Sequence, residues 1–316
     1  MKPQNLLTSI FLLPFVGIIG LLTGCGGGGT KDSPGIGIPF TKWSDIDPPV
    51  TVTVDGLSME ADYEAPAPDY TVTQITDPVI TTSSSASITY DPDGLITKIS
   101  VTTPSGTVTW DDALADEHIG VTAWAGVIGA ADDAGSKVIL LMDPVHPTNG
   151  WDYQTFGAWE TGRGTGAGAV GAISIGAPTA GSAIPTIGGA EFTGRTVGAY
   201  VNADGNDFLT LSSLTVNVSF ADRQLELVSA DTITIDPLTS VPAPQPGLDL
   251  SGTLSYSAGV NSFTGNLTTV GSDSVSSMTG TSRGRFYGPN AEELGGVFAV
   301  KGDGIESYGG SYGAAR

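Results

Sequence analysis

Alternation of apolar and polar residues with a period of two is the pattern that most constrains this chain. The clearest example is the segment Leu214–Phe220, in which apolar residues alternate with Thr215, Asn217 and Ser219. Successive side chains of a β-strand point to opposite faces, so this segment predicts a strand with one apolar and one polar face. The best helical candidate, the acid-rich stretch 111–119, is short. The sequence therefore predicts an all-β protein.

Turn signals divide the alternating segments into two regions. In the first, roughly 36–145, the turn residues Asp91–Gly94 separate a run that ends at Tyr90 from the run Leu95–Val101, which predicts a hairpin. The second region begins near Trp151 and contains roughly eight short, closely spaced strands. That number and spacing favour a closed antiparallel barrel.

Charge and residue counts exclude several classes of protein. The chain has 12 Lys and Arg against 33 Asp and Glu, a net charge of −21, which argues against nucleic-acid binding because phosphates need a basic surface. A single Cys excludes a disulfide framework and a cysteine-cluster metal site. Two His leave little material for zinc binding or acid–base chemistry. These counts favour a binding or structural protein, and we expect no enzymatic activity.

The N-terminus carries a targeting segment. An apolar run, Leu6–Leu22, follows Lys2 and ends in Leu-Thr-Gly-Cys, which resembles the lipobox of bacterial lipoproteins. The alternative is a transmembrane helix, for which this run with its internal Pro14 is close to the minimum length. We expect residues 1–24 to be a signal peptide and Cys25 to carry the fatty-acyl chains, palmitate among them, that anchor the protein to a membrane. The glycine-rich stretch 25–35 then acts as a flexible tether.

A Gly-x-Ser-x-Gly pattern at Gly280–Gly284 is the one hydrolase motif in the chain. That motif requires a sharp strand-to-helix turn that exposes the serine. Here Arg285-Phe286-Tyr287 continue a strand, and both His precede Ser282, opposite to the order in that hydrolase fold. We therefore interpret Ser282 as a structural residue and expect no catalytic residues.

Three further kinds of motif have an ordinary structural interpretation beside a functional one. Gly162–Gly168 lacks the Gly-Lys-Ser/Thr ending of a phosphate loop, which favours a flexible strand connection. The oxygen-rich turns Asp91–Gly94 and Asp204–Asp207 lack the bidentate Glu of a calcium loop, which favours ordinary turns. His118 and His146 lie in loop-like segments and are expected to be solvated, with haem ligation as the alternative. We expect no metal and no resident cofactor, and leave haem open as a ligand.

The stretch from Asp236 to Gly247 is rich in proline. A long loop in a compact domain is usually functional or mobile, and proline-rich segments are ordered before they bind. The loop is either a solvated strand connection or a contact surface for a partner. The candidate ligand-binding residues on it are Val241, Pro242, Pro244 and Pro246.

Two stretches resemble the transferrin-binding protein B family of surface lipoproteins, which includes factor H-binding and haem-scavenging lipoproteins. Gly284–Phe298 is similar to the closing hairpin of the family's barrel, and Trp151–Trp159 is similar to its opening strand in the single-lobe, transferrin-binding protein-like group. Phe192–Gly198 and the ending Tyr308–Arg316 also look like that group. The residues that carry the fold signature are Trp151, Phe156, Trp159, Gly284, Phe286, Tyr287, Gly288, Pro289, Gly295, Gly296 and Phe298.

The resemblance implies a β-rich handle domain at 36–147, followed by an eight-stranded antiparallel β-barrel at 148–316. It also implies a lipid anchor in the bacterial outer membrane, with the folded part at the cell surface. The function that it implies is capture of a host or environmental ligand, of the iron-carrier-protein or haem class, and the acidic chain favours a basic partner surface. The chain has length for one handle and one barrel, whereas transferrin-binding protein B has two of each. A structural or adhesive envelope lipoprotein without a nutrient ligand is the alternative.

Overall fold

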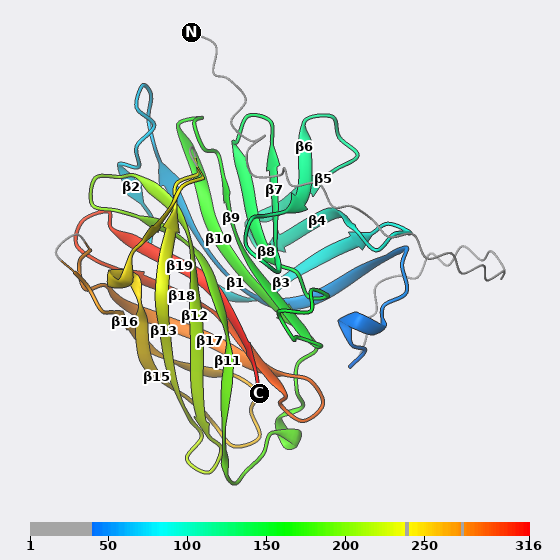
Figure 1. The fold of residues 1–316 in the computed structure, drawn as a ribbon. Helices are drawn as coiled ribbons and strands as arrows, with labels where there is room; N and C mark the ends of the chain where they lie inside the picture. Colours follow the sequence, from blue (N-terminus) through cyan, green and yellow to red (C-terminus); the bar gives the residue numbers. More distant parts are fainter. Residues whose placement is uncertain (1–39, 238–239, 273–274) are drawn as a thin grey trace.

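The computed structural model describes residues 40–237, 240–272 and 275–316, and these residues form two large antiparallel sheets (Figure 1). The expectation of an all-β protein is confirmed. Cys25, residues 1–24 and the tether lie outside the described residues. No helix in the described ranges is long and apolar enough to cross a membrane.

The N-terminal sheet has ten strands and is nearly closed. In order of hydrogen bonding it contains β5 (Gly106–Asp111), β4 (Ile96–Thr103), β3 (Val79–Tyr90), β1 (Val50–Glu64), β10 (Ala167–Gly176), β9 (Gln154–Thr161), β8 (Lys137–Met142), β7 (Val127–Asp132) and β6 (Glu117–Val121), with β2 (Gln74–Ile75) beside β1.

Side chains bridge the gap between the edge strands β5 and β6 of this sheet. The Lys137 ammonium donates to the Thr109 carbonyl at 2.6 Å and to the Glu117 carboxylate at 2.5 Å. The second oxygen of Glu117 accepts the Asp111 N–H at 2.8 Å. Polar side chains thus bond backbone N–H and C=O groups at the edge of the sheet. In a closed barrel, backbone groups of the neighbouring strand would be the partners.

The C-terminal sheet closes on itself into an eight-stranded barrel, because β12 pairs with both β11 and β13. A ninth strand, β14 (Pro242–Pro244), lies against the end of β13. The barrel strands are, in order, β12 (Asp207–Ser219), β11 (Gly189–Val201), β19 (Ser307–Ala315), β18 (Glu293–Lys301), β17 (Thr279–Tyr287), β16 (Phe263–Thr269), β15 (Leu250–Tyr256) and β13 (Gln224–Ile235).

Each sheet encloses its own apolar core. In the barrel, the buried Phe286 ring contacts four other aromatic rings, with centroid separations between 5.3 and 6.3 Å. In the N-terminal sheet, Trp110 and Trp159 are fully buried among aliphatic residues of the other strands. The inward positions of the alternating strands supply both cores, as the period of two predicts.

A third cluster joins the two sheets. It contains Met59 of β1, Phe156 of β9 and Val297 of β18. Small residues on β19 allow this close approach, since a Cβ at Gly313 would lie 2.4 Å from the Phe156 ring. The Ser311 hydroxyl donates to the Gly157 carbonyl at 2.8 Å, and the Gln154 amide donates to the Leu294 carbonyl at 2.8 Å. The outer faces of β18 and β19 are therefore buried like a core.

The structure corrects one interpretation of a local segment and shows how a second segment folds. The stretch Trp151–Trp159 does not open the barrel, because β9 pairs with β8 and β10 in the N-terminal sheet and the barrel strands begin at Gly189. Alternation encodes which face a residue occupies and carries no information on the partner strand. The stretch 111–119 forms no helix; it ends β5, turns, and enters β6, where Glu117 accepts from the Asp111 backbone.

Candidate functional site

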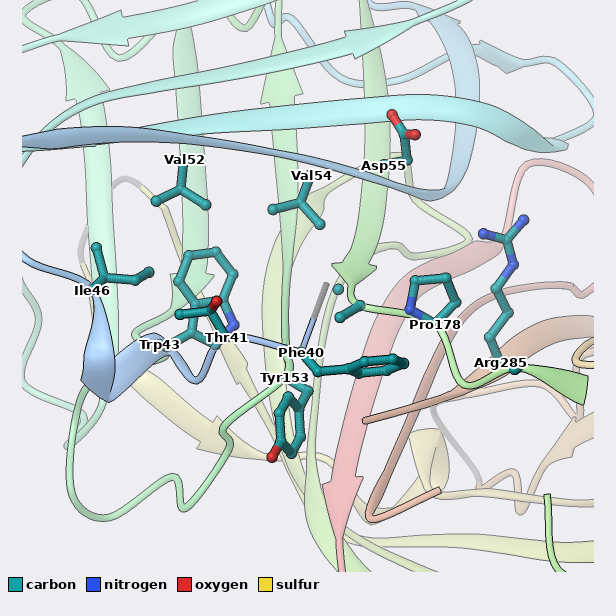
Figure 2. A pocket seen from close by; sticks show the side chains of 13 residues that line it. Phe40, Thr41, Trp43, Ile46, Val52, Val54, Asp55, Tyr153, Pro178 and Arg285 are labelled. Carbon is teal, nitrogen blue, oxygen red and sulfur yellow. The ribbon is translucent and has the colours of Figure 1, made fainter. Parts of the chain in front are cut away.

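A pocket of about 490 Å³ lies where the two sheets meet (Figure 2), and we call it the junction pocket. Four parts of the fold line it: the segment before β1, strand β1 itself, the residue before β9, and the end of β10 with its connection to the barrel. One residue of β17 completes the lining. The lining residues are Phe40, Thr41, Trp43, Ile46, Val52, Val54, Asp55, Tyr153, Gly176, Ala177, Pro178, Ala180 and Arg285.

The segment before β1 is fixed by contacts to residue Asp152. The Trp43 N–H donates to the Asp152 carbonyl at 2.9 Å, and the Lys42 ammonium lies 2.6 Å from its carboxylate. The Phe40 ring meets the Tyr153 ring edge-on, with centroids 6.4 Å apart. These contacts place three aromatic side chains, Phe40, Trp43 and Tyr153, along the pocket.

The opposite wall is the connection between the sheets, which is hydrogen-bonded to the barrel. The Thr179 N–H donates to the Phe286 carbonyl at 2.9 Å, and the Gly288 N–H donates to the Ala177 carbonyl at 2.9 Å. The Asn261 amide ties the same wall down, with bonds of 2.7 Å to the Thr179 carbonyl and 2.8 Å to the Phe286 carbonyl. The wall at Pro178 is thus part of a continuous hydrogen-bonded structure.

A buried carboxylate of the barrel supports the Tyr153 side of the pocket. Glu293 accepts the N–H groups of Asp152 and Tyr153 at 2.5 and 3.1 Å. Burial raises the pKa of Glu293 to about 8, because desolvation outweighs these hydrogen bonds. The pocket wall and the barrel are therefore coupled through one titratable group.

The charged residues of the lining are Asp55 and Arg285, and in Figure 2 the Asp55 carboxylate lies on the opposite face of strand β1 from the side chains of Val52 and Val54. They form no ion pair with one another. Within the described ranges, the Arg285 side chain makes no hydrogen bond and no ion pair, whereas Arg163 bridges the buried carboxylate of Glu160 and the half-buried carboxylate of Asp207 at 3.2 and 3.1 Å. The remaining walls are apolar or aromatic.

The proline-rich candidate loop lies on the barrel, away from this pocket. Residues Pro242–Pro244 form an exposed edge strand, β14, whose prolines are compatible with an edge position. Val241 is 59% exposed, and Pro246 begins a short 3₁₀ turn that buries Leu248. The structure therefore presents all four candidates, Val241, Pro242, Pro244 and Pro246, at the surface.

The other candidate motifs have ordinary structural environments. Ser282 lies inside strand β17, fully buried, and its hydroxyl donates to the Val297 carbonyl at 3.0 Å and contacts the Tyr312 hydroxyl at 2.8 Å. The His118 imidazole lies 2.9 Å from Asp133, and the His146 imidazole lies 2.8 Å from the Thr148 hydroxyl. No group of three or more His, Cys, Asp or Glu able to hold a metal occurs in the described part of the chain.

The fold-signature residues divide between the two sheets and their junction. Phe286 fills the barrel core, Trp159 the core of the N-terminal sheet, and Phe156 the cluster between them. Tyr287 bonds the Ser174 hydroxyl of β10 at 3.1 Å, and Pro289 lies in the turn between β17 and β18. The barrel core also receives Phe298, while Gly295 and Gly296 lie on β18, where Gly295 approaches Gln154. These residues act in packing.

Sequence reasoning missed the junction pocket. Its walls come from positions as distant as Phe40 and Arg285, and no local motif marks them. The one local signal is an arginine at the end of a strand in a chain with few basic residues.

The barrel matches a known family. Residues 184–316 match the model that describes the C-lobe and N-lobe β-barrels of transferrin-binding protein B. No curated protein sequence matches the chain. The described sheets define a two-sheet, all-β protein, and this match shows that its barrel domain is of the transferrin-binding protein B type.

Several solved structures are similar in fold. A mutant transferrin-binding protein B from Actinobacillus pleuropneumoniae is 13% identical, with 82% of this chain and 99% of that chain covered and a TM-score of 0.45. The isotype 1 protein from serogroup B Neisseria meningitidis is 19% identical, with 76% and 45% covered and a TM-score of 0.41. A structure described as a surface lipoprotein is 13% identical, with 82% and 98% covered and a TM-score of 0.41. These values are too low to carry an argument about a ligand.

Proposed function

We propose that this chain is a lipid-anchored binding protein of the bacterial outer-membrane surface that captures an iron-carrier protein. The observation that carries the proposal is the match of residues 184–316 to barrels of a transferrin-binding protein. The Leu-Thr-Gly-Cys sequence that ends at Cys25 supports the anchor, and the glycine-rich stretch after it supports display away from the bilayer.

The chemistry of the described surface favours a protein ligand over haem. His118 and His146 lie on different elements, and each ring is engaged by a neighbouring side chain. The exposed Val241, Pro242 and Pro244 supply a pre-ordered apolar contact surface, and such anchors contribute most interface energy. The net charge of −21 steers basic protein surfaces toward the molecule.

A pull-down with the domain from Ser33 to Arg316 tests the proposal. We expect the immobilised domain to retain iron-loaded transferrin or another iron-carrier protein from serum, and to take up no stoichiometric haem in a separate titration. Retention of no iron carrier would favour the alternative, a structural or adhesive envelope lipoprotein. Stoichiometric haem uptake would move the proposal to the haem class.

A further inference from the structure

The junction pocket has the size and the walls of a small-molecule site. Ligand pockets of proteins typically measure about 300–1,000 Å³ and are lined by apolar and aromatic residues with a few polar groups. The junction pocket, at about 490 Å³, is lined by three aromatic rings and by aliphatic residues such as Val52 and Val54. An apolar body of one or two rings, or a branched aliphatic chain, fits such walls.

The charge of the pocket is set by Arg285. Acidic residues outnumber basic ones by 33 to 12 in this chain, yet the guanidinium of the half-buried residue Arg285 has no carboxylate within ion-pair distance in the described ranges. A guanidinium presents a planar fork of N–H donors that matches a carboxylate with two parallel hydrogen bonds. An anionic group on a ligand would supply the ion-pair partner that the described part of the protein does not give to Arg285.

The backbone around Arg285 is held in place before any ligand binds. Arg285 is paired with Gly295 of β18, and the next residues of β17 are bonded to the connection at Ala177 and Thr179. The backbone of Arg285 therefore needs no rearrangement for its side chain to meet a ligand.

From the apolar walls and the unpaired guanidinium, we propose that the junction pocket binds a small monocarboxylate with an aromatic or branched aliphatic body, and that Arg285 binds its carboxylate. This site is separate from the capture of a protein ligand, and goes beyond it. One guanidinium in the lining matches one carboxylate on the ligand.

Calorimetric titration of the full chain in a neutral detergent with 1-naphthoate tests the proposal. We expect saturable binding, and Arg285→Gln should raise the Kd at least about tenfold, as for loss of a charge-assisted pair. The matched control is Arg283→Gln, on the same strand and the same face, whose guanidinium is bonded to Ser262 and does not line the pocket. The uncharged 1-naphthalenemethanol should bind weakly and equally to both variants.

One further variant blocks the pocket. Val54→Trp should abolish binding of both probes by filling the pocket. Partition into micelles is the same for all variants and cancels in the comparison. Absence of saturable 1-naphthoate binding, or equal Kd values for wild type and Arg285→Gln, would overturn the proposal, as would binding that survives Val54→Trp.

Discussion

Glu293, on barrel strand β18, accepts the backbone N–H of Tyr153 at 3.1 Å from inside the interface between the two sheets. This buried carboxylate is 2% exposed, so its ionisation has to be accommodated without water. The position of the pocket wall at Tyr153 is therefore linked to the protonation of a group in the barrel. Glu160 is a second buried carboxylate, at the other end of strand β9, where Arg163 and Asp207 surround it.

We predict that stability falls as pH rises from 6 to 9. Desolvation raises the pKa of Glu293 to about 8, and desolvation together with the charge of Asp207 raises the pKa of Glu160 to about 8. The ordinary value of 4.5 applies to the unfolded chain, so the folded state holds more protons between pH 4.5 and 8. The stability that these two groups contribute is thus greatest below pH 4.5 and decreases through this window. Thermal unfolding followed by circular dichroism should give a Tm lower at pH 9 than at pH 6 by a few degrees.

The variants Glu293→Gln and Glu160→Gln, combined, should flatten this dependence. The control is Glu292→Gln, since hydrogen bonds from Asn290 outweigh desolvation and hold the pKa of Glu292 below its ordinary value. That variant should keep the wild-type slope. A Tm that rises between pH 6 and 9, or a double variant with an unchanged slope, would contradict the assignment.

We predict that Ser282 and Tyr312 are coupled in stability. Ser282→Ala should cost about 1–3 kcal/mol, because it leaves the buried Tyr312 hydroxyl without its partner. In the double variant with Tyr312→Phe the second deletion should cost less than it does alone, and chemical denaturation of the four proteins measures the difference. Strictly additive costs would show that the two hydroxyls do not interact. Loss of an esterase activity on Ser282→Ala would instead revive the hydrolase interpretation.

We predict that Gly313→Ala loosens the contact between the sheets. The added Cβ would lie 2.4 Å from the Phe156 ring, and overpacking of this kind costs about 1–3 kcal/mol. Combining Gly313→Ala with Phe156→Leu, which replaces the ring by a smaller side chain, should recover part of the lost stability. Denaturant titration checks both variants, and a Gly313→Ala protein as stable as wild type would mean that the sheets can separate without cost.

We predict that the proline-rich loop contributes to binding and not to folding. Replacing Val241–Pro246 by a short Gly/Ser turn removes an exposed strand of three residues and leaves the closure between β12 and β13 intact. The Tm should be unchanged, and the affinity for the captured protein should fall. Salt should slow association more than it speeds dissociation, as surface plasmon resonance can show. Wild-type affinity in the replaced protein would place the binding surface elsewhere, with the N-terminal sheet as the next candidate.

Local features of the fold could be predicted from the sequence, and partner choice between strands could not. The hairpin at Asp91–Gly94 and the strand through Leu214 and Val218 are present as their turn residues and alternation indicate. Strand β9 shows the limit: Trp159 points into one core and Phe156 into the interface, so both faces are buried and the pattern is the same whichever sheet the strand joins.

The candidate site was less predictable than the fold. Ser282 could be assigned a structural role because its flanking residues continue a strand. The junction pocket could not be predicted, because it depends on contacts between positions more than a hundred residues apart, such as Lys42 with Asp152. The chain has few basic residues, but this alone does not single out Arg285. Only the structure shows that its side chain has no partner among the described residues.

Binding of labelled transferrin to intact cells tests most directly the claim that this chain is an anchored surface receptor. Cells that produce wild type should bind the label and incorporate a fatty-acid analogue into the protein. Cells that produce Cys25→Ser should do neither, although the variant contains every described strand. No binding by wild-type cells would contradict capture of this iron carrier, and equal labelling and binding by the two kinds of cell would contradict the anchor at Cys25.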